Sequence, residues 1–276
     1  MSVKFYADNH KYESTDLFEG IEWLSVSRLV SKFHEEFDPI KASEKATKNR
    51  NSKWYKIDVQ EIRDRWDAEG TRSTTLGTWY HDKQEAKVLS KPTYNYNGIE
   101  LPVFRPEIVD GIKIAPDQKL VEGIYPEHFV YLKSIGVCGQ SDKVKIVNGH
   151  IKVNDFKTSK ELKVEGFKNW EGITKKMLPP LAHLDDANLI HYALQLSTYA
   201  HIIWKHNPSY IVDNPIIEHV IFEIESEDEF GYPIMKLDEN GEPIVKEVIE
   251  IPVPYMKREV ELMFDSIKRQ KQLKNV

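Results

Sequence analysis

The spacing between apolar positions changes several times along this chain, and each spacing predicts a helix or a strand. Apolar and polar positions alternate on both sides of Asn148-Gly149, which is typical of two half-buried strands joined by a tight turn. Over residues 188–205 the apolar positions fall on one helical stripe, which consists of Leu189, Tyr192, Ala193, Leu196, Ala200 and Ile203. A β-branched run over residues 216–224 then predicts a further strand. This order indicates an α/β fold.

The N-terminal third of the chain predicts helices with recognisable ends. A helix over residues 28–37 is capped by the segment that begins at Ser25 and is stopped by Asp38-Pro39. A second helix is predicted over residues 58–69, and a third begins near residue 74. Three separate helices therefore precede the alternating strands.

The remaining segments complete one sheet and its covering helices. Residues 90–114 are rich in proline, tyrosine, asparagine and glycine, which predicts an irregular insertion, with or without a hairpin. Asp185 or Asp186 is the predicted cap of the helix over residues 188–205, and Pro254 opens a last helix. One mixed sheet with helices on both sides accounts for this order.

Carboxylates and a lysine meet on the predicted hairpin around Asn148-Gly149. Asp142 falls in its first strand, and Asp155 and Lys157 fall at the end of its second. Asp155 and Lys157 are two positions apart, so in a strand they project from the same face. Carboxylates can bind a hard divalent cation that polarises a phosphate and activates water, while a lysine orients the nucleophile or balances charge. The pattern predicts metal-assisted phosphodiester cleavage.

Three further motifs stand in order around this hairpin. Gly77-Thr78-Trp79-Tyr80-His81 lies upstream, Glu127 precedes Asp142, and Gln195-Leu196-Ser197-Thr198-Tyr199 lies downstream. With Asp155-Phe156-Lys157 they resemble the PD-(D/E)XK nucleases, and within that family the RecB-like and phage exonuclease branch. Ser141 stands where the family name has proline, a residue that this branch often lacks.

The resemblance implies a restriction-endonuclease-like core with a mixed central sheet flanked by helices on both sides. It also implies roles for particular residues. The implied metal ligands, for Mg²⁺ with Mn²⁺ as a substitute, are His81, Glu127, Asp142, Asp155 and the backbone carbonyl of Phe156. The implied catalytic residues are Glu127, Asp142, Asp155, Lys157, Gln195 and Tyr199. Glu122 competes with Glu127 for its role, and Glu85 ranks below it as a further acid.

We accordingly expect one nuclease domain over residues 1–276. Its expected parts are an N-terminal helical elaboration (1–75), a catalytic core (76–225) and a C-terminal hairpin and helix (226–276).

Cysteine content and hydropathy indicate the cellular compartment of this protein. Cys138 is the only cysteine, which excludes an internal disulfide and the four-cysteine iron–sulfur cluster of some related nucleases. No apolar run approaches the length of a membrane span, and the N-terminus lacks a signal-peptide core. We expect a cytoplasmic protein without membrane contact, in the host cytoplasm if a phage encodes it.

The chain has a net charge of −6, but two of its stretches are locally basic. Residues 41–56 hold six basic residues against one acid, and residues 157–176 hold six against three. Each also carries aromatic residues, and basic groups on phosphates with aromatic faces for bases are how single strands are bound. The predicted DNA-binding residues are Lys48, Lys53, Trp54, Tyr55, Thr158, Ser159, Lys160 and Trp170. The alternative for either stretch is a solvated charged surface. We favour DNA binding because we expect both stretches to lie beside the metal site.

The sequence thus predicts a divalent-metal-dependent DNA exonuclease that acts at single-stranded or free ends, in phage or mobile-element recombination, repair or replication. Two alternatives remain open: a flap or junction endonuclease or an RNase on the same fold, and a non-catalytic DNA-binding module. No Walker-type motif is present, so any ATP-driven unwinding must come from a partner. A helicase or annealing-protein partner and a homo-oligomer are compatible with the resemblance.

Overall fold

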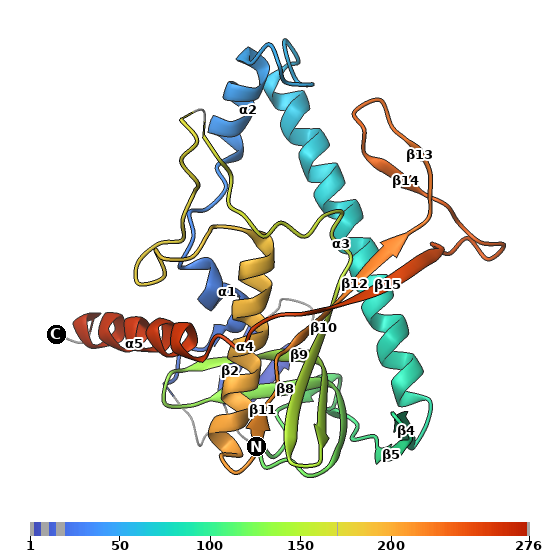
Figure 1. Ribbon diagram of the computed structural model, residues 1–276, viewed down its shortest axis with the longest axis vertical. Helices are drawn as coiled ribbons and strands as arrows, with labels where there is room; N and C mark the ends of the chain where they lie inside the picture. The colour runs from blue at the N-terminus through green and yellow to red at the C-terminus, as the bar shows by residue number, and fades with distance from the viewer. Residues whose placement is uncertain (1–2, 7–10, 15–19, 170, 275–276) are drawn as a thin grey trace.

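The computed structural model describes residues 3–6, 11–14, 20–169 and 171–274. They form a mixed α/β fold with a central sheet flanked by helices, as predicted (Figure 1). The sheet order runs β15, β12, β10, β9, and β8 lies on the other edge of β9. These strands are β8 (Gly123–Leu132), β9 (Val137–Val147), β10 (His150–Lys157), β12 (Ile216–Phe222) and β15 (Val245–Pro252). Two short strands extend the sheet. β3 (Leu24–Ser25) pairs with β9, and β11 (Ile211–Val212) pairs with β10.

The sheet is mixed because of its central strand. β10 runs antiparallel to β9 and parallel to β12. Asn148 and Gly149 form the predicted two-residue turn between β9 and β10, with φ angles of 51° and 74°. Positive φ at both central residues matches the right-handed twist of the strands, and asparagine and glycine adopt it readily. The predicted hairpin is therefore confirmed.

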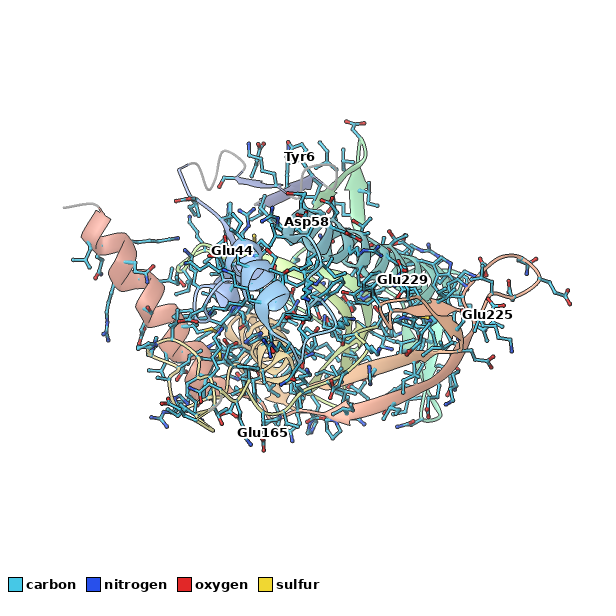
Figure 2. All side chains as sticks on the ribbon, turned by 90° about the horizontal axis from the view of Figure 1, so that it is seen from above. Tyr6, Glu44, Asp58, Glu165, Glu225 and Glu229 are labelled. Carbon is cyan, nitrogen blue, oxygen red and sulfur yellow. The ribbon has the colours of Figure 1, made fainter. Side chains whose placement is uncertain are left out.

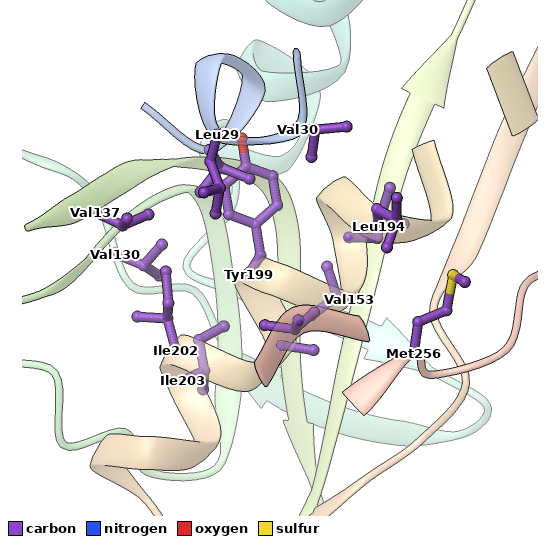
Figure 3. Close-up of a cluster of buried hydrophobic side chains, with 14 of the residues drawn as sticks. Leu29, Val30, Val130, Val137, Val153, Leu194, Tyr199, Ile202, Ile203 and Met256 are labelled. Atoms are coloured by element: carbon purple, nitrogen blue, oxygen red, sulfur yellow. The ribbon is translucent and has the colours of Figure 1, made fainter. Parts of the chain in front are cut away.

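Helices cover both faces of the sheet. On one face α4 (Asn188–His206), α5 (Lys257–Lys274) and α1 (Val26–Ser31) enclose the main core. Figure 3 shows the α4 side chains of Leu194, Tyr199 and Ile202 among side chains from α1 and the strands. On the other face, Tyr80 of α3 (Val59–Leu89) packs against Phe156 and Val220.

The third and second predicted helices are one helix, so the predicted break near residues 70–74 is wrong. Asp58 caps α3 by accepting hydrogen bonds from the backbone N–H groups of Gln60 and Glu61. Thr74 and Thr75 do not cap a new helix, because their hydroxyls donate to carbonyls one turn earlier inside α3. A single interior glycine, Gly70, costs a helix only about 1 kcal/mol and does not interrupt α3, although residues 70–75 are exposed.

The first predicted helix is shorter than expected, and a further helix follows it. Ser25 caps α1 as predicted, since its hydroxyl accepts from the Arg28 N–H at 3.2 Å. Asp38-Pro39 begins α2 (Pro39–Lys48) instead of only stopping α1. Asp38 accepts from the Lys41 N–H at 3.0 Å, and proline at the first helical position has no N–H to leave unsatisfied.

The insertion over residues 90–114 is more regular than predicted. It contains two hairpins, β4 (Thr93–Tyr96) with β5 (Ile99–Pro102), and β6 (Glu107–Val109) with β7 (Ile112–Ile114). β7 also pairs with β1 (Val3–Tyr6), which in turn pairs with β2 (Lys11–Ser14). The N-terminal part is therefore not purely helical, and its expected boundary at residue 75 falls inside α3.

The C-terminal elements also depart in part from prediction. β13 (Ile224–Glu227) and β14 (Pro233–Met235) form a hairpin of their own, while β15 joins the central sheet beside β12. α4 begins at the predicted residue and ends one residue later than predicted, but its N-cap is Ala187, which offers no side-chain cap. Asp185 and Asp186 are engaged by Lys176 and Lys175 instead. Among the described residues, no helix combines the length and apolar composition needed to cross a membrane.

Candidate active site

The candidate site lies where β9 and β10 part. Their pairing ends at Lys143 and Asn154, and from Asn154 onward β10 pairs with β12 on its other edge. Beyond the last pair, the carboxylate of Asp142 replaces the backbone of β9 as a partner. Its Oδ2 accepts a hydrogen bond from the Phe156 N–H at 2.8 Å. The end of β10, with its candidate residues, is thereby fixed beside Asp142.

His81 reaches this point from α3. Its Nδ1 lies 3.3 Å from Asp142 Oδ2, and its Nε2 lies 3.2 Å from the carbonyl oxygen of Phe156. Gly77, one turn earlier, explains the close approach of the helix. A Cβ at Gly77 would lie 3.3 Å from Thr158 Oγ1, which directly follows the end of β10. The spacing of glycine and histidine in the Gly77–His81 motif therefore has a packing reason.

Glu127 comes to the same point from β8. The register pairs Pro126 with Lys143 and His128 with Ser141, so Glu127 stands opposite Asp142. Glu127 has a φ of 45°, which is uncommon for a residue with a side chain. One ligand atom each from His81, Glu127 and Asp142 lies within 4.8 Å of the others, a spacing that can hold a metal ion.

Glu122, the competing acid, is used elsewhere. Its carboxylate accepts a hydrogen bond from the Asn148 N–H at 2.7 Å, at the turn between β9 and β10. That contact occupies Glu122 at the opposite end of the hairpin from Asp142. The structure therefore brings Glu127 to the candidate site and not Glu122.

Asp155 and Lys157 form a buried ion pair next to this group. Lys157 Nζ lies 2.5 Å from Asp155 Oδ2, and the side chains are only 17% and 3% exposed. The ammonium group also lies 4.7 Å from the ring centre of Tyr192 on α4. Asp155 is not one of the three residues whose ligand atoms lie within 4.8 Å of one another, because its carboxylate turns toward Lys157.

The three carboxyl groups of the site differ in the direction of their pKa shifts. Burial and the charge of Asp142 raise the pKa of Glu127 to about 7 and that of Asp155 to about 6. Burial would also raise the pKa of Asp142, but the hydrogen bond and charge of His81 outweigh it and lower that pKa. Asp142 is thus the carboxylate most firmly held as an anion.

The two cationic groups of the site are held in their charged forms. Burial disfavours the His81 imidazolium, yet its hydrogen bond to Asp142 and the charge of Asp142 raise the pKa of His81 to about 9. Burial likewise opposes the charge of Lys157, but Asp155 and Asp142 raise its pKa above the ordinary value. Negative charge therefore dominates the environment of both groups.

Gln195 and Tyr199 lie on one face of α4, as predicted. Gln195 Nε2 donates to the Tyr199 hydroxyl over 3.3 Å, and both side chains line a cleft of about 560 Å³ with His81, Glu127 and Asp142. Tyr199 packs close to β9, and a Cβ at Gly139 would lie only 2.8 Å from its ring. Gln195 and Tyr199 therefore form a wall of the cleft.

Two residues beside the site were not predicted. Lys113 of β7 donates to Gln140 Oε1 at 2.6 Å and lies 3.9 Å from Glu127 Oε2. It comes from the insertion, and no local signal tied that segment to the site. The sequence pattern places Tyr192 in the apolar stripe of its helix. Its position three residues before Gln195 could have predicted that both side chains lie on the same face. Glu85, ranked below Glu127, also lines the cleft.

The first basic stretch lies away from this cleft. Figure 1 shows α2 beside the N-terminal end of α3, and Val59 is about 33 Å from His81 along the helix axis. Lys48 and Lys53 are exposed there. The expectation that residues 41–56 lie beside the metal site is therefore wrong, because one unbroken helix separates the two.

Trp54 does not offer a free face for bases, so that prediction is wrong. It is 6% exposed, and its ring stacks on Phe230 at 4.9 Å and meets Trp66 edge-on at 6.1 Å. The loop between β13 and β14 thus packs on α3 and on the connection between α2 and α3, an arrangement that Arg65 supports by pairing with Glu229 at 2.9 Å. Figure 2 shows Glu229 close to α3. Tyr55 is half-buried.

The residues after β10 differ in how accessible they are. Thr158 is half-buried against Gly77, and Lys160 is exposed with its Nζ 3.4 Å from the Gly231 carbonyl. The hydroxyl of Ser159 is buried without a hydrogen-bond partner among the described residues, so it is not presented to a phosphate as predicted. Trp170 lies outside the described residues.

Comparison of the chain with family models, with curated proteins and with solved structures gives no match to any of the three.

Proposed function

We propose that this protein is a divalent-metal-dependent nuclease of the PD-(D/E)XK type that hydrolyses phosphodiester bonds at DNA ends. The observation that carries the proposal is the convergence of His81, Glu127 and Asp142 within 4.8 Å, with the Asp155–Lys157 pair at the adjoining strand end. These residues come from one helix and three neighbouring strands. Their meeting at one end of the central hairpin supports the proposal.

The donor set fits a hard divalent cation. Asp142 and Glu127 supply carboxylate oxygens, and His81 supplies a nitrogen once a bound cation displaces the proton that its raised pKa retains. Asp155 would add a further oxygen by turning from Lys157 toward the ion. Burial and mutual repulsion raise the pKa of Glu127 and of Asp155, so bound positive charge would favour the ionised form of both. A Mg²⁺ or Mn²⁺ ion, when bound, supplies Lewis-acid polarisation of the phosphate and a water of lowered pKa.

The side chains of the chain supply orientation and charge. Lys157 keeps its proton through Asp155 and Asp142, and its ammonium group can balance the negative charge that develops on the phosphate. The Phe156 N–H holds the Asp142 carboxylate in a fixed orientation. Gln195 and Tyr199 can contact a phosphate or sugar from the wall of the cleft that they form.

The choice of DNA ends as substrate rests on the resemblance of the two flanking motifs to those of end-processing nucleases. One metal site can serve any phosphodiester, so flap or junction DNA and RNA are the competing substrates. Degenerate, non-catalytic relatives lose an acid or the lysine, whereas this chain keeps all of them. That retention favours an enzyme over a binding module.

A substrate panel tests the proposal directly. End-labelled single-stranded, duplex and flapped DNA, and RNA of the same sequence, are incubated with the protein in Mg²⁺, in Mn²⁺ and in EDTA. We expect mononucleotides or short oligonucleotides from DNA ends, no cleavage in EDTA, and restoration by Mg²⁺. Internal cuts at a flap, or cleavage of RNA alone, would replace the exonuclease proposal by its alternatives. Binding without cleavage in both metals would favour the non-catalytic module.

A further inference from the structure

A second group of metal-ligating side chains lies outside the cleft, where α4 begins. His34, Asp186 and His191 each offer one ligand atom, and these atoms all lie within 4.8 Å of one another. His34 follows α1, Asp186 lies near the end of the connection formed by residues 158–187, and His191 is in the first turn of α4. Three segments that are far apart in the sequence therefore meet at one point.

The spacing of Asp186 and His191 suits neighbouring ligands of one ion. His191 Nε2 lies 2.8 Å from Asp186 Oδ1, yet this buried nitrogen has no partner with hydrogen-bond geometry among the described residues. Two ligand atoms at about 2.1 Å from a tetrahedral metal are about 3.4 Å apart, so these two atoms need to separate by only about 0.6 Å to hold one ion. The rings of His34 and His191 stack at 4.4 Å with an interplanar angle of 15°, and one nitrogen of each ring lies within 4.8 Å of the other.

The surrounding groups orient these side chains. His34 Nδ1 lies 3.2 Å from the Glu35 carbonyl oxygen, and a proton on Nδ1 would leave the Nε2 lone pair for a metal. Lys175 Nζ lies 2.9 Å from Asp186 Oδ2 and 3.4 Å from Glu35 Oε2. Lys175 thus engages one oxygen of Asp186 and leaves Oδ1 facing His191. Outer contacts of this kind are typical of metal-bound histidines and carboxylates.

We propose that His34, Asp186 and His191 bind one transition-metal ion of the zinc class. Two imidazole nitrogens and one carboxylate oxygen favour Zn²⁺ over Mg²⁺, which prefers oxygen ligands. Three protein ligands leave a fourth tetrahedral position for water or another small ligand. The site is independent of the proposed nuclease function, because none of its ligands belongs to the group of His81, Glu127 and Asp142.

Such an ion would cross-link the segment that follows Lys157. Residues 158–187 contain isolated bridges and no helix or strand among the described residues. One direct backbone contact already ties this segment to the end of α1, the hydrogen bond from Leu178 N to the Phe33 carbonyl at 2.7 Å. A metal held by His34, Asp186 and His191 would join the end of the segment to α1 and α4 together. Its occupancy would therefore stabilise the folded chain.

The test uses the full chain with His81→Asn and Asp142→Asn, so that the other histidine–carboxylate group no longer competes. Protein stripped with EDTA and desalted is titrated with Zn²⁺ by calorimetry and with Co²⁺ by visible absorption. We expect one equivalent of either metal, and a higher melting temperature with Zn²⁺. Adding His34→Asn and His191→Asn should abolish both effects. Adding His183→Asn should change neither, because His183 pairs with Glu259 outside the cluster.

Failure of the background protein to bind Zn²⁺ or Co²⁺ would overturn the proposal, as would unchanged binding after His34→Asn and His191→Asn. Circular dichroism shows whether that variant is folded. If it is not, modification of histidines by diethyl pyrocarbonate in the background protein gives the decisive measurement. Zn²⁺ should protect His34 and His191 but not His183, and equal modification of all three with and without Zn²⁺ would contradict the site.

Discussion

The Asp142 carboxylate accepts a hydrogen bond from the Phe156 N–H at 2.8 Å, at the position where β9 and β10 stop pairing. One side chain therefore has two separate tasks. Its oxygen satisfies a backbone donor that the strand pairing leaves free, and its charge contributes to the candidate metal site. The two tasks can be separated experimentally, because an amide oxygen accepts hydrogen bonds without carrying a negative charge.

Asp142→Asn and Asp142→Ala should therefore differ in stability although both lose activity. Asparagine can still accept from the Phe156 N–H, whereas alanine leaves that donor without its partner, at a cost of about 1–3 kcal/mol. Urea unfolding measures the difference between the two variants, and Mg²⁺-dependent cleavage measures the shared loss. Equal unfolding free energies for the two variants would show that the hydrogen bond contributes nothing.

Lys157→Met should lower the turnover number by about 100-fold or more, since it removes a positive charge aimed at the developing phosphate charge. Methionine preserves most of the side-chain volume, and Asp155 can take up a proton when it loses its partner. Lys160→Met is the matched control, because Lys160 is exposed and lies three residues further along. Lys160→Met should leave the turnover number unchanged. At most, it should reduce the slope of log DNA affinity against log salt concentration by about 0.7–0.9. Similar turnover losses in both variants would contradict the role of Lys157.

Gly70 and Gly77 offer a comparison inside one helix. Replacing an interior helical glycine by alanine gains about 1 kcal/mol when nothing obstructs the new methyl group. A Cβ at Gly70 meets nothing within 4 Å, whereas one at Gly77 lies 3.3 Å from Thr158 Oγ1. Gly70→Ala should stabilise the protein by about that amount, and Gly77→Ala should stabilise it less or destabilise it. Chemical denaturation of both variants measures the difference.

Thr158 provides the control for this comparison. If its hydroxyl is the obstruction, Thr158→Ala should restore much of the missing stabilisation in a Gly77→Ala background, and the two substitutions should be non-additive. Gly77→Ala should also weaken Mg²⁺-dependent cleavage, because His81 lies one turn further along the displaced helix. Full activity with undiminished stabilisation would show that α3 does not need the glycine to approach β10.

Features with a local cause could be predicted from the sequence. Asn148 and Gly149 specify their turn by their own conformational preferences, and the apolar stripe of α4 specifies the buried face of that helix. Asp142, Asp155 and Lys157 follow from the same hairpin, because alternation fixes which side chains share a face. These parts of the fold, and the meeting of Asp142 with His81 and Glu127, agree with the structure.

Features with a distant cause could not be predicted. α3 is anchored at two separated points, by buried Ile62 and buried Tyr80, while residues 70–75 between them are exposed, so local propensity near Gly70 gives the wrong answer. Lys113 lies beside Glu127 on β7, a strand that pairs with β1, and no local pattern indicates either contact. Trp54 is buried by Phe230, a residue from the opposite end of the chain. Its neighbouring lysines indicated a solvent-exposed stretch, but they do not determine where the ring packs.

The burial of Trp54 changes what its removal should do. Trp54→Ala should lower the free energy of unfolding by about 3–5 kcal/mol, because it leaves a cavity between Phe230 and Trp66. It should not weaken single-stranded DNA binding more than duplex binding. Tyr55→Ala, at the adjacent half-buried position, is the matched control and should cost less stability. A selective loss of single-strand affinity at unchanged stability would restore the base-stacking role.

His201 should make the protein less stable in mild acid. Burial lowers the pKa of His201 to about 4, with smaller contributions from Lys205 and Lys257, against an ordinary value of 6.5. The unfolded chain therefore binds this proton at a higher pH than the folded chain. Stability is unaffected by His201 above about pH 6.5 and falls as the pH decreases towards 4, by at most about 3 kcal/mol.

Two variants isolate this contribution in urea-unfolding curves recorded between pH 4 and pH 7. His201→Asn should flatten the pH dependence, since asparagine does not titrate but can still bond to the Tyr255 hydroxyl, which lies 2.8 Å from His201 Nδ1. Tyr255→Phe removes that hydroxyl and should lower stability at every pH while keeping the slope. Other titrating groups contribute equally to all three proteins, so the difference in slope belongs to His201. A slope in His201→Asn equal to that of the unmodified protein would show that the folded chain accepts a proton on His201 without cost.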